Sequence, residues 1–520
     1  MTGLISFLIG ITPIIWLFLG LCVLRLPGHI VCPLGLALAA ALAFSGMGAP
    51  ASEITTAAFE GALFALWPIL LAVVAAMILY KYSVETGGMD KIKALLTGVS
   101  RDKRILVLIL AWGFGGFLEG IAGFGVPVMI PGCILVSLGF SPMFSVVACL
   151  VANSAPTPYA TIGIPVTTLS GVTGIDAGLL GFNVAVQLFV PCLIIPFFLV
   201  MLTGGGFRAI RGVGLIALIS GLSFAIPLLL VSRFIGPELP TLLGSVCAIA
   251  CTAAAAKRFY RDEDAYNRKF QLDQAPPDTL TPEARSAPPV TAAQAALPFG
   301  IVLVLVTATS LIGPVHEALS KIRLDAVVFS GEGGYTLSFV FLLTPGVLIL
   351  VSVLLSCFLQ GRKLKEFVII AKNTVFESRK TIATVVSIVA MAKIMDYSGM
   401  TDAIALMLIA AFGAAYPLIA PVIGMLGTFI TGSDTTCCIL FGSLQAGAAR
   451  AIGANPAWIA SANLSAAAAG KMISPQSVAV GLRIGGLDGR EGEIIRQTLK
   501  YALVCTAVIC VASYGGAQGF

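Results

Sequence analysis

The chain contains 520 residues, of which 58% are hydrophobic and 11% are charged, whereas a soluble domain carries about 25% charged residues. Apolar runs of about 20 residues recur from end to end, which is typical of an all-α polytopic membrane protein with roughly 12 or more spans. The net charge of +6 is small and dispersed, so we expect the lipid bilayer, and no nucleic acid, as a partner.

The first apolar run, residues 4–24, has no basic leader and no small-residue cleavage site, which indicates a first spanning helix. Lysine and arginine then concentrate in loops that the positive-inside rule assigns to the cytoplasm. These loops are residues 81–104, 208–211, 257–285, 362–380 and 483–500. Loops assigned to the outside are residues 48–62, 171–178, 314–335 and 397–402. Both termini are then predicted to be external.

Composition divides the chain into five segments. They are the N-terminal helices (residues 1–62), a first repeat (63–235), a spanning helix with a polar linker (236–295), linking helices (296–375) and a second repeat (376–520). The stretch 257–295 is polar and Pro-rich, which favours a flexible cytoplasmic tether. A regulatory segment is the alternative interpretation.

Short matches in the same order relate the two halves at offsets of about 310 residues. "YSVETGGMD" (82–90) matches "YSGMTD" (397–402), and "LGFSP" (138–142) matches "IGANP" (452–456). In each half an asparagine precedes a proline by twelve residues. Since Tyr82 borders a cytoplasmic loop and Tyr397 an external one, the repeats are predicted to be inverted. Inverted repeats with broken or re-entrant helices near the midplane are typical of secondary transporters.

The segments "GFLEGIAGFGVPV" (116–128) and "GTFITGSDTT" (427–436) combine helix breakers with a carboxylate in apolar surroundings. Broken backbone at membrane depth has to face protein or a water-filled cavity, so the two segments are predicted to face each other across one cavity. A buried charge there costs between about 3 and 15 kcal/mol, and burial favours the neutral form of a carboxyl group. Glu119 and Asp434 are therefore candidate proton carriers, with helix capping as the alternative, above all for Asp434.

The segments 151–166 and 461–477 place small polar side chains around the matching prolines. Helix N-termini at such breaks carry partial positive charge and bind carboxylates. The candidate substrate-binding residues are Asn153, Ser154, Thr157, Tyr159, Thr161, Ser433, Thr435, Thr436, Asn463, Ser465, Ser474 and Gln476, together with Lys471. Hydrogen bonding between helices is the alternative role for about half of them.

Five ionisable residues are interpreted individually. Lys471 is predicted to pair either with an anionic substrate or with Asp434. Lys393 and Asp396 lie near the end of a span, where snorkelling and mutual pairing explain them. His29 and His316 are expected to be loop or interface residues.

Motifs of enzymes and of ATP-driven pumps are missing from the sequence. It contains no Walker loop, no HExxH and no CxxC. The 12 cysteines lie almost wholly within apolar runs, which indicates small buried hydrophobic residues rather than redox or metal sites. We therefore expect no catalytic residue, no metal and no cofactor.

Four motifs in order, "AWGFGGFLEGIAGFGVPVMI", "NSAPTPYATIGIPV", "GTFITGSDTTCCILFGSLQ" and "GKMISPQSVAV", resemble the L-lactate permease family over nearly the whole chain. The resemblance implies a bacterial inner-membrane transporter that takes up L-lactate, and often D-lactate and glycolate, with protons. It also implies that the polar residues at the breaks form the substrate path. The residues alone leave two alternatives open: another ion-coupled carboxylate transporter (sodium-driven, or for gluconate, citrate or short fatty acids), and a passive anion channel.

Overall fold

The computed structural model describes residues 2–24, 26–123, 125–260, 267–272, 290–331, 336–482, 484, 487 and 490–517. Most of the predicted linker, 261–266 and 273–289, lies outside these residues, as do Arg483 and the side chain of His316. Ten stretches of the described chain are long and apolar enough to cross a membrane. Three shorter apolar helices add to them, which confirms the polytopic helical fold.

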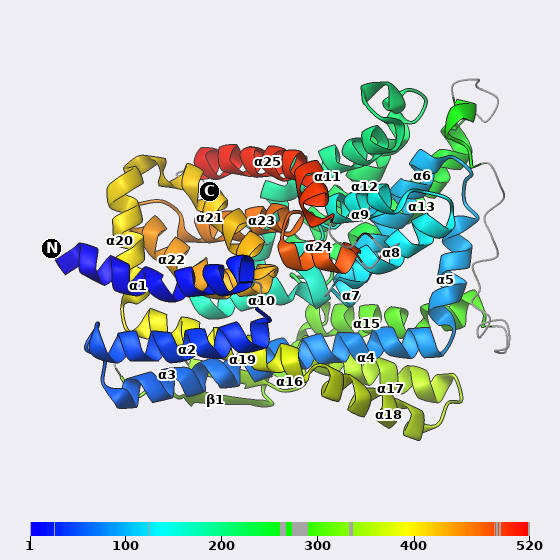
Figure 1. Ribbon diagram of the computed structural model, residues 1–520. Helices are drawn as coiled ribbons and strands as arrows, with labels where there is room; N and C mark the ends of the chain where they lie inside the picture. The colour runs from blue at the N-terminus through cyan, green and yellow to red at the C-terminus, as the bar shows by residue number, and fades with distance from the viewer. Residues whose placement is uncertain are drawn as a thin grey trace.

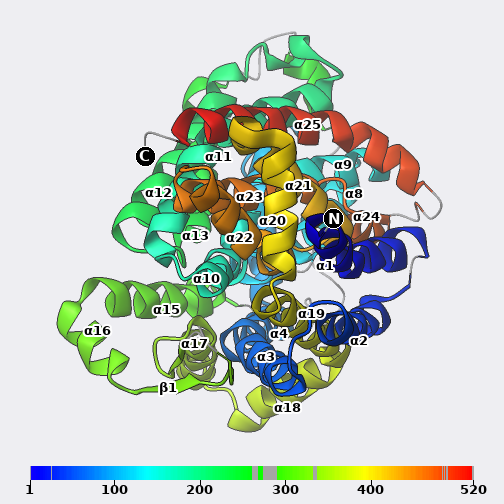
Figure 2. The ribbon, with the colours of Figure 1, turned by 90° about the vertical axis from the view of Figure 1, so that its left-hand side faces the viewer.

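The helices form two layers, which both views show (Figures 1 and 2). The lower layer contains α2 (Gly28–Ser45), α3 (Ala51–Phe64), α4 (Leu71–Glu85), α15 (Ala292–Leu311), α16 (Gly313–Ser320), α17 (Pro345–Leu359), α18 (Leu364–Glu377) and α19 (Arg379–Tyr397). The upper layer contains α6 (Lys103–Val107), α7 (Gly115–Ile121), α8 (Val126–Ser137), α9 (Pro142–Ala152), α10 (Ala160–Thr173), α11 (Ala177–Gly204), α12 (Gly214–Phe234), α13 (Pro240–Phe259), α21 (Tyr416–Thr431), α22 (Asp434–Ala451), α23 (Pro456–Lys471), α24 (Pro475–Leu482) and α25 (Glu491–Gly516). The N-terminal helix α1 (Thr2–Phe18) lies between the layers.

The two repeats are visible as matching elements. Helix α4 is followed by α5 (Gly88–Thr97), whose N-cap Gly87 is left-handed with φ +74°. Helix α19 is followed by α20 (Met400–Phe412), whose N-cap Gly399 has φ +78°. Glycine adopts this backbone conformation without the penalty that a Cβ brings. The same turn chemistry therefore starts the same element in each half.

The matching elements point in opposite directions. Helices α5 and α20 each connect the lower layer to the upper one, but they do so at opposite ends of the molecule (Figure 1). The chain termini lie toward the end at which α20 lies, and α6 lies at the other end. This arrangement is the inverted repeat that the charge pattern of the sequence predicts.

Each repeat contains a helical hairpin that enters the upper layer and returns. Helices α8 and α9 form the first, and they contain 12 and 11 residues. At 1.5 Å per residue each is about 18 Å long, too short to cross a hydrocarbon core of about 30 Å. Helices α22 and α23 form the second hairpin. Ser141 and Asn455 cap the returning helices α9 and α23, and in each a proline follows the cap.

Close packing holds the second hairpin against α21. A Cβ on Gly424 would lie 2.1 Å from the backbone oxygen of Asn463, so only glycine fits at this crossing. Small residues of this kind allow helices in membranes to approach each other. The run Ala466–Ala469 on α23 is buried as a result.

One pair of β-strands lies among the described helices. Strands β1 (Arg323–Val327) and β2 (Thr336–Val340) form an antiparallel pair in which Arg323 lies opposite Val340. They follow α16, and β1 lies within residues 314–335, which the sequence predicts only as an external loop, whereas β2 begins directly after that loop. The five residues of β1 are mostly exposed, and a two-stranded hairpin adds little to the core.

Candidate functional site

Four interrupted segments meet around one polar cavity of about 110 Å³. They are the break between α7 and α8, the segment before α10, the break between α21 and α22, and the break between α23 and α24. Both helical hairpins therefore begin and end at this cavity. Nine residues proposed from the sequence line it: Glu119, Asn153, Thr157, Thr161, Ser433, Asp434, Thr435, Lys471 and Gln476.

The first break follows Ile121, where α7 ends. Gly123 and Gly125 have φ of +55° and +85°, so the chain turns there through conformations that suit glycine. A Cβ on Gly123 would lie 2.9 Å from the Thr161 hydroxyl, which leaves room for no larger residue. The turn leaves Glu119, on the last turn of α7, fully buried at the cavity.

The second break lies between α21 and α22. Gly432 has φ +72°, and a Cβ on it would lie 2.2 Å from Oε1 of Gln476. The helix that follows is capped by Ser433, whose hydroxyl accepts a hydrogen bond from the Thr436 backbone N–H at 3.3 Å. The capping interpretation of Asp434 is therefore wrong, because its neighbour performs that role.

The third break bends the backbone within the first turn of α10. Thr161 and Ile162 have φ of +49° and +56°, and Gly163 continues the left-handed turn with φ +77°. A β-branched residue with positive φ is a genuine outlier that the surrounding structure has to hold in place. The turn directs the Thr161 side chain to the cavity and brings Gly163 against the backbone of Pro237.

The fourth break ends α23 at Lys471. Nζ of Lys471 lies 2.6 Å from Oε1 of Glu119, whose side chain is fully buried. The lysine thus pairs with the glutamate of the other repeat, a partner that the sequence interpretation did not consider. The pair joins the two halves of the chain at the cavity wall.

Three polar side chains at the cavity have oxygens without a hydrogen-bond partner among the described residues. They are both carboxylate oxygens of Asp434, Oδ1 of Asn153 and Oε2 of Glu119. Lys471 and Glu119 act electrostatically on Asp434, and the Thr157 and Thr428 hydroxyls lie near it. With all three groups ionised, the cavity carries two negative charges and one positive charge. A further anion then meets a net charge of −1.

The remaining proposed residues do not line this cavity, and most of their side chains form hydrogen bonds within the protein. The Tyr159 hydroxyl donates to the backbone of Gly181, and Ser154 donates to the backbone of Val151. Ser465 donates to Gln187 at 2.8 Å. None of these three side chains lines the cavity.

Three more assignments change on the second hairpin and on α24. Oδ1 of Asn463 accepts from Gln445, which in turn accepts from the Tyr416 hydroxyl, so Asn463 belongs to a buried network between helices. Ser474 lies at the start of α24, where its hydroxyl accepts from the backbone of Ser477. The Thr436 side chain does not line the cavity. Of these three, Asn463 has the helix-bridging role that small polar residues commonly have in membranes.

Sequence reasoning missed one polar residue of the cavity and misread a buried lysine. Ser477 lines the cavity, one residue after Gln476, within the quoted segment 461–477. Lys393 does not snorkel: its side chain is 7% exposed, and its ammonium lies 2.9 Å from Oε1 of Glu60. Asp396 lies close enough to interact electrostatically with the Lys393 ammonium. Spacing along one helix could not reveal a partner on another.

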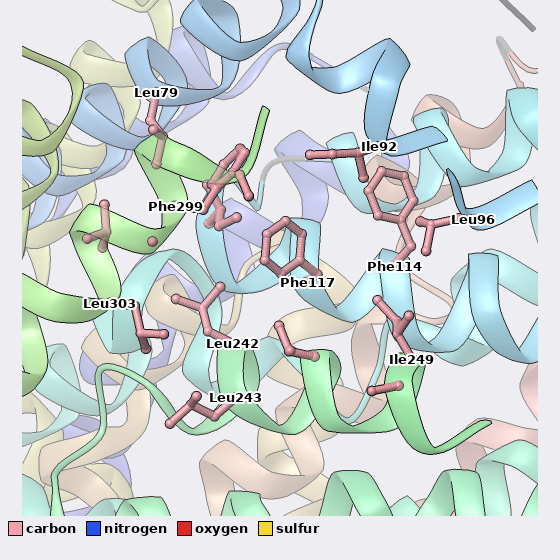
Figure 3. Close-up of a pocket in the computed structure, with 16 residues that line it drawn as sticks. Leu79, Ile92, Leu96, Phe114, Phe117, Leu242, Leu243, Ile249, Phe299 and Leu303 are labelled. Atoms are coloured by element: carbon pink, nitrogen blue, oxygen red, sulfur yellow. The ribbon is translucent and has the colours of Figure 1, made fainter. Parts of the chain in front are cut away.

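A larger cavity of about 390 Å³ lies on the other side of α7. Its walls come from α4, α5, α7, α13 and α15 and are almost entirely hydrocarbon, as Figure 3 shows. Phe117 of α7 points into it, with its ring centroid 5.3 Å from that of Phe299. Because an anion would be desolvated there without any polar partner, the smaller cavity is the candidate site for a charged ligand.

Comparison with known proteins identifies relatives along the whole chain. The model of the L-lactate permease family matches residues 6–515. An L-lactate permease of Streptococcus iniae is 42% identical over 87% of this chain and 93% of its own length. The glycolate permease GlcA of Escherichia coli (strain K12) is 33% identical over 97% and 94%. A crystal structure of the Alcanivorax borkumensis YdaH transporter, described as having an unusual topology, aligns with a TM-score of 0.43 at 15% identity over 86% of this chain and 85% of that one.

Proposed function

The chain belongs to the L-lactate permease family, a family of transporters rather than enzymes, and on that premise we propose that it imports L-lactate, with D-lactate and glycolate, in symport with protons. The membrane is the bacterial inner membrane, and both termini face outside. A relative named as a glycolate permease supports the inclusion of glycolate.

The observation that carries the proposal is the Lys471–Glu119 pair beside the unpartnered Asp434. The Lys471 ammonium is the cation of the cavity to which a substrate carboxylate binds. The substrate reaches it by replacing Glu119, and this would leave the glutamate buried without its partner. An unpaired buried carboxylate is strongly disfavoured, so Glu119 takes up a proton as the substrate binds. Binding of the anion and binding of the proton are thereby linked.

The net charge of the cavity leads to the same linkage. A monocarboxylate that enters while Glu119 and Asp434 are both ionised changes the net charge of the cavity from −1 to −2. Protonation of either residue restores −1, so Glu119 is the first candidate proton carrier and Asp434 the second. The N–H groups at the start of α22 and the side chains of Thr161 and Gln476 are the further donors for the substrate.

Proton coupling also supplies the driving force. A membrane potential negative inside opposes entry of an anion by about 2.3 kcal/mol per 100 mV. One proton moving with each anion cancels this opposition and lets the pH gradient drive uptake.

Uptake of labelled L-lactate into proteoliposomes tests the proposal. An inward pH gradient should drive accumulation of lactate and glycolate, an inward sodium gradient at equal pH should not, and unlabelled lactate inside should accelerate exchange. Accumulation driven only by sodium would contradict proton symport. Flux without counterflow exchange would indicate a channel.

A further inference from the structure

A second buried lysine–glutamate pair lies away from the cavity. Nζ of Lys393 on α19 lies 2.9 Å from Oε1 of Glu60 on α3, with the two side chains 7% and 0% exposed. The Tyr397 hydroxyl donates to the same Glu60 oxygen at 2.7 Å, whereas Glu60 Oε2 has no hydrogen-bond partner among the described residues. Ionisable groups at such depth are rare in membrane proteins and mark substrate or proton paths.

Asp396 completes a cluster with the same charges as the main cavity. It lies one turn after Lys393, and the Ser443 hydroxyl lies 3.5 Å from its Oδ2. Asp396, Lys393 and Ser443 line a cavity of about 10 Å³, roughly the space that one water molecule needs. The cluster thus contains one lysine, one glutamate and one aspartate, as Glu119, Asp434 and Lys471 do.

On one side the cluster continues toward the end of the molecule at which α20 lies. The Tyr397 ring stacks on Phe329, with centroids 3.8 Å apart. Both residues line another cavity of about 10 Å³. Glu53, in the first turn of α3, lines the same cavity. Two small cavities, one lined by Glu53 and Tyr397 and the other by Lys393 and Asp396, therefore lie on either side of the Tyr397–Glu60 hydrogen bond.

On the other side the cluster continues toward the candidate substrate site. Ser443 and Asp434 lie on the same helix, α22, nine residues apart, which is roughly 13 Å along the helix axis. The Ser443 hydroxyl also donates to the backbone oxygen of Val172 at 2.8 Å. Val172 lies near the end of α10, the helix that begins beside Thr161. Two helices thus connect the cluster to the main cavity.

We propose that Glu60, Lys393 and Asp396 form a second proton-binding site, through which the transported proton passes between the α20 end of the molecule and Asp434. The inference rests on the proton coupling proposed above. A proton from water binds a carboxylate oxygen of Asp396 and is released again to water on the side of α22, so no other species is consumed. The ionisable groups that act on Asp396 are Lys393 and Glu60, together with Asp402 from α20.

The Asp396→Asn variant, purified and reconstituted, tests this site with two readouts. Uptake driven by an imposed pH gradient should fall by about tenfold or more, as expected when a proton-transfer group is lost. Lactate–lactate exchange, which needs no net proton movement, should stay within about twofold of wild type. Glu317→Gln is the control, because Glu317 is an exposed carboxylate on α16 and is not among the groups that act on Asp396, and it should leave both readouts unchanged.

Each other outcome decides against the second site. Normal pH-driven uptake by Asp396→Asn overturns it and leaves the proposed symport intact. Loss of exchange together with uptake in a folded variant shows that the cluster only supports the structure. If the wild type takes up lactate with a sodium gradient and the variant does not, the cluster is a sodium site. If the wild type shows no pH-driven uptake, both proposals are overturned. If Asp396→Asn does not fold, Tyr397→Phe, which keeps the ring and removes the hydroxyl from Glu60, undergoes the same test.

Discussion

Lys471 and Glu119 lie 352 positions apart in the sequence, and their charged groups lie 2.6 Å apart. One belongs to each repeat, so the pair is a contact between the two inverted halves. Any change in the relative position of the halves acts on this contact. An anion that competes for Lys471 acts on it as well.

Replacing Glu119 by glutamine should abolish lactate uptake driven by a pH gradient while lactate–lactate exchange persists. Glutamine resembles the protonated glutamate, so the substrate can bind but the protein cannot release a proton. Proteoliposomes loaded with unlabelled lactate measure exchange, and an imposed gradient measures coupling. Glu317→Gln, at an exposed position on α16, serves as the control and should behave like wild type.

Replacing Asp434 by asparagine should flatten the pH dependence of lactate binding. In wild type, lactate should bind more tightly at pH 6 than at pH 8, because protonation removes a negative charge from the cavity. The variant lacks one of the two acidic groups, and titration calorimetry at both pH values measures the difference. An unchanged ratio of affinities would show that Asp434 takes no part in coupling.

Replacing Lys471 by methionine should destabilise the protein by about 3 to 5 kcal/mol, because Glu119 is left buried and unpaired. Adding Glu119→Gln to this variant should recover most of the stability but no lactate binding. Thermal unfolding in detergent measures the first effect and ligand-induced stabilisation the second. Lactate binding by the double variant would contradict the role of the ammonium.

Replacing Gly432 by alanine should reduce transport far more than stability alone explains. The new methyl group would lie 2.2 Å from Gln476 Oε1 and would displace a residue of the cavity. Gly174→Ala is the control, because Gly174 is also left-handed (φ +69°) but has open space around it. In both variants an alanine has to adopt a left-handed backbone conformation, which costs about 1 kcal/mol. A larger loss of uptake in Gly432→Ala than in Gly174→Ala therefore reports the steric clash.

Replacing Arg104 by alanine should destabilise the fold by about 3 to 5 kcal/mol, since its buried partner Asp102 is left unpaired. The guanidinium also donates to the backbone oxygens of Ala209 and Arg211, which ties α6 to the segment before α12. Arg323→Ala removes an exposed ion pair with Asp325 and should change stability by less than about 1 kcal/mol. Equal shifts in melting temperature would contradict the difference in burial.

Local sequence was enough to predict the spans, the repeats and the breaks. Apolar run length reflects the thickness of the bilayer. Helix breakers combined with a carboxylate in an apolar run indicated that segments 116–128 and 427–436 are breaks, whereas prolines without such neighbours, such as Pro191 and Pro196, lie inside α11. A carboxylate in such a segment has to face a cavity, which placed Glu119 and Asp434 at the site before any contact was known.

Only the tertiary structure decided which polar side chains face the cavity and which partners the lysines have. Tyr159 and Thr161 lie two residues apart, yet one is bonded to the backbone of Gly181 and the other lines the cavity, because the left-handed turn at Thr161 reorients the chain between them. The pairs Lys471–Glu119 and Lys393–Glu60 each join helices more than 300 residues apart. Such pairings depend on how the repeats pack against each other, and hydrophobic periodicity along a single helix contains no information about that packing.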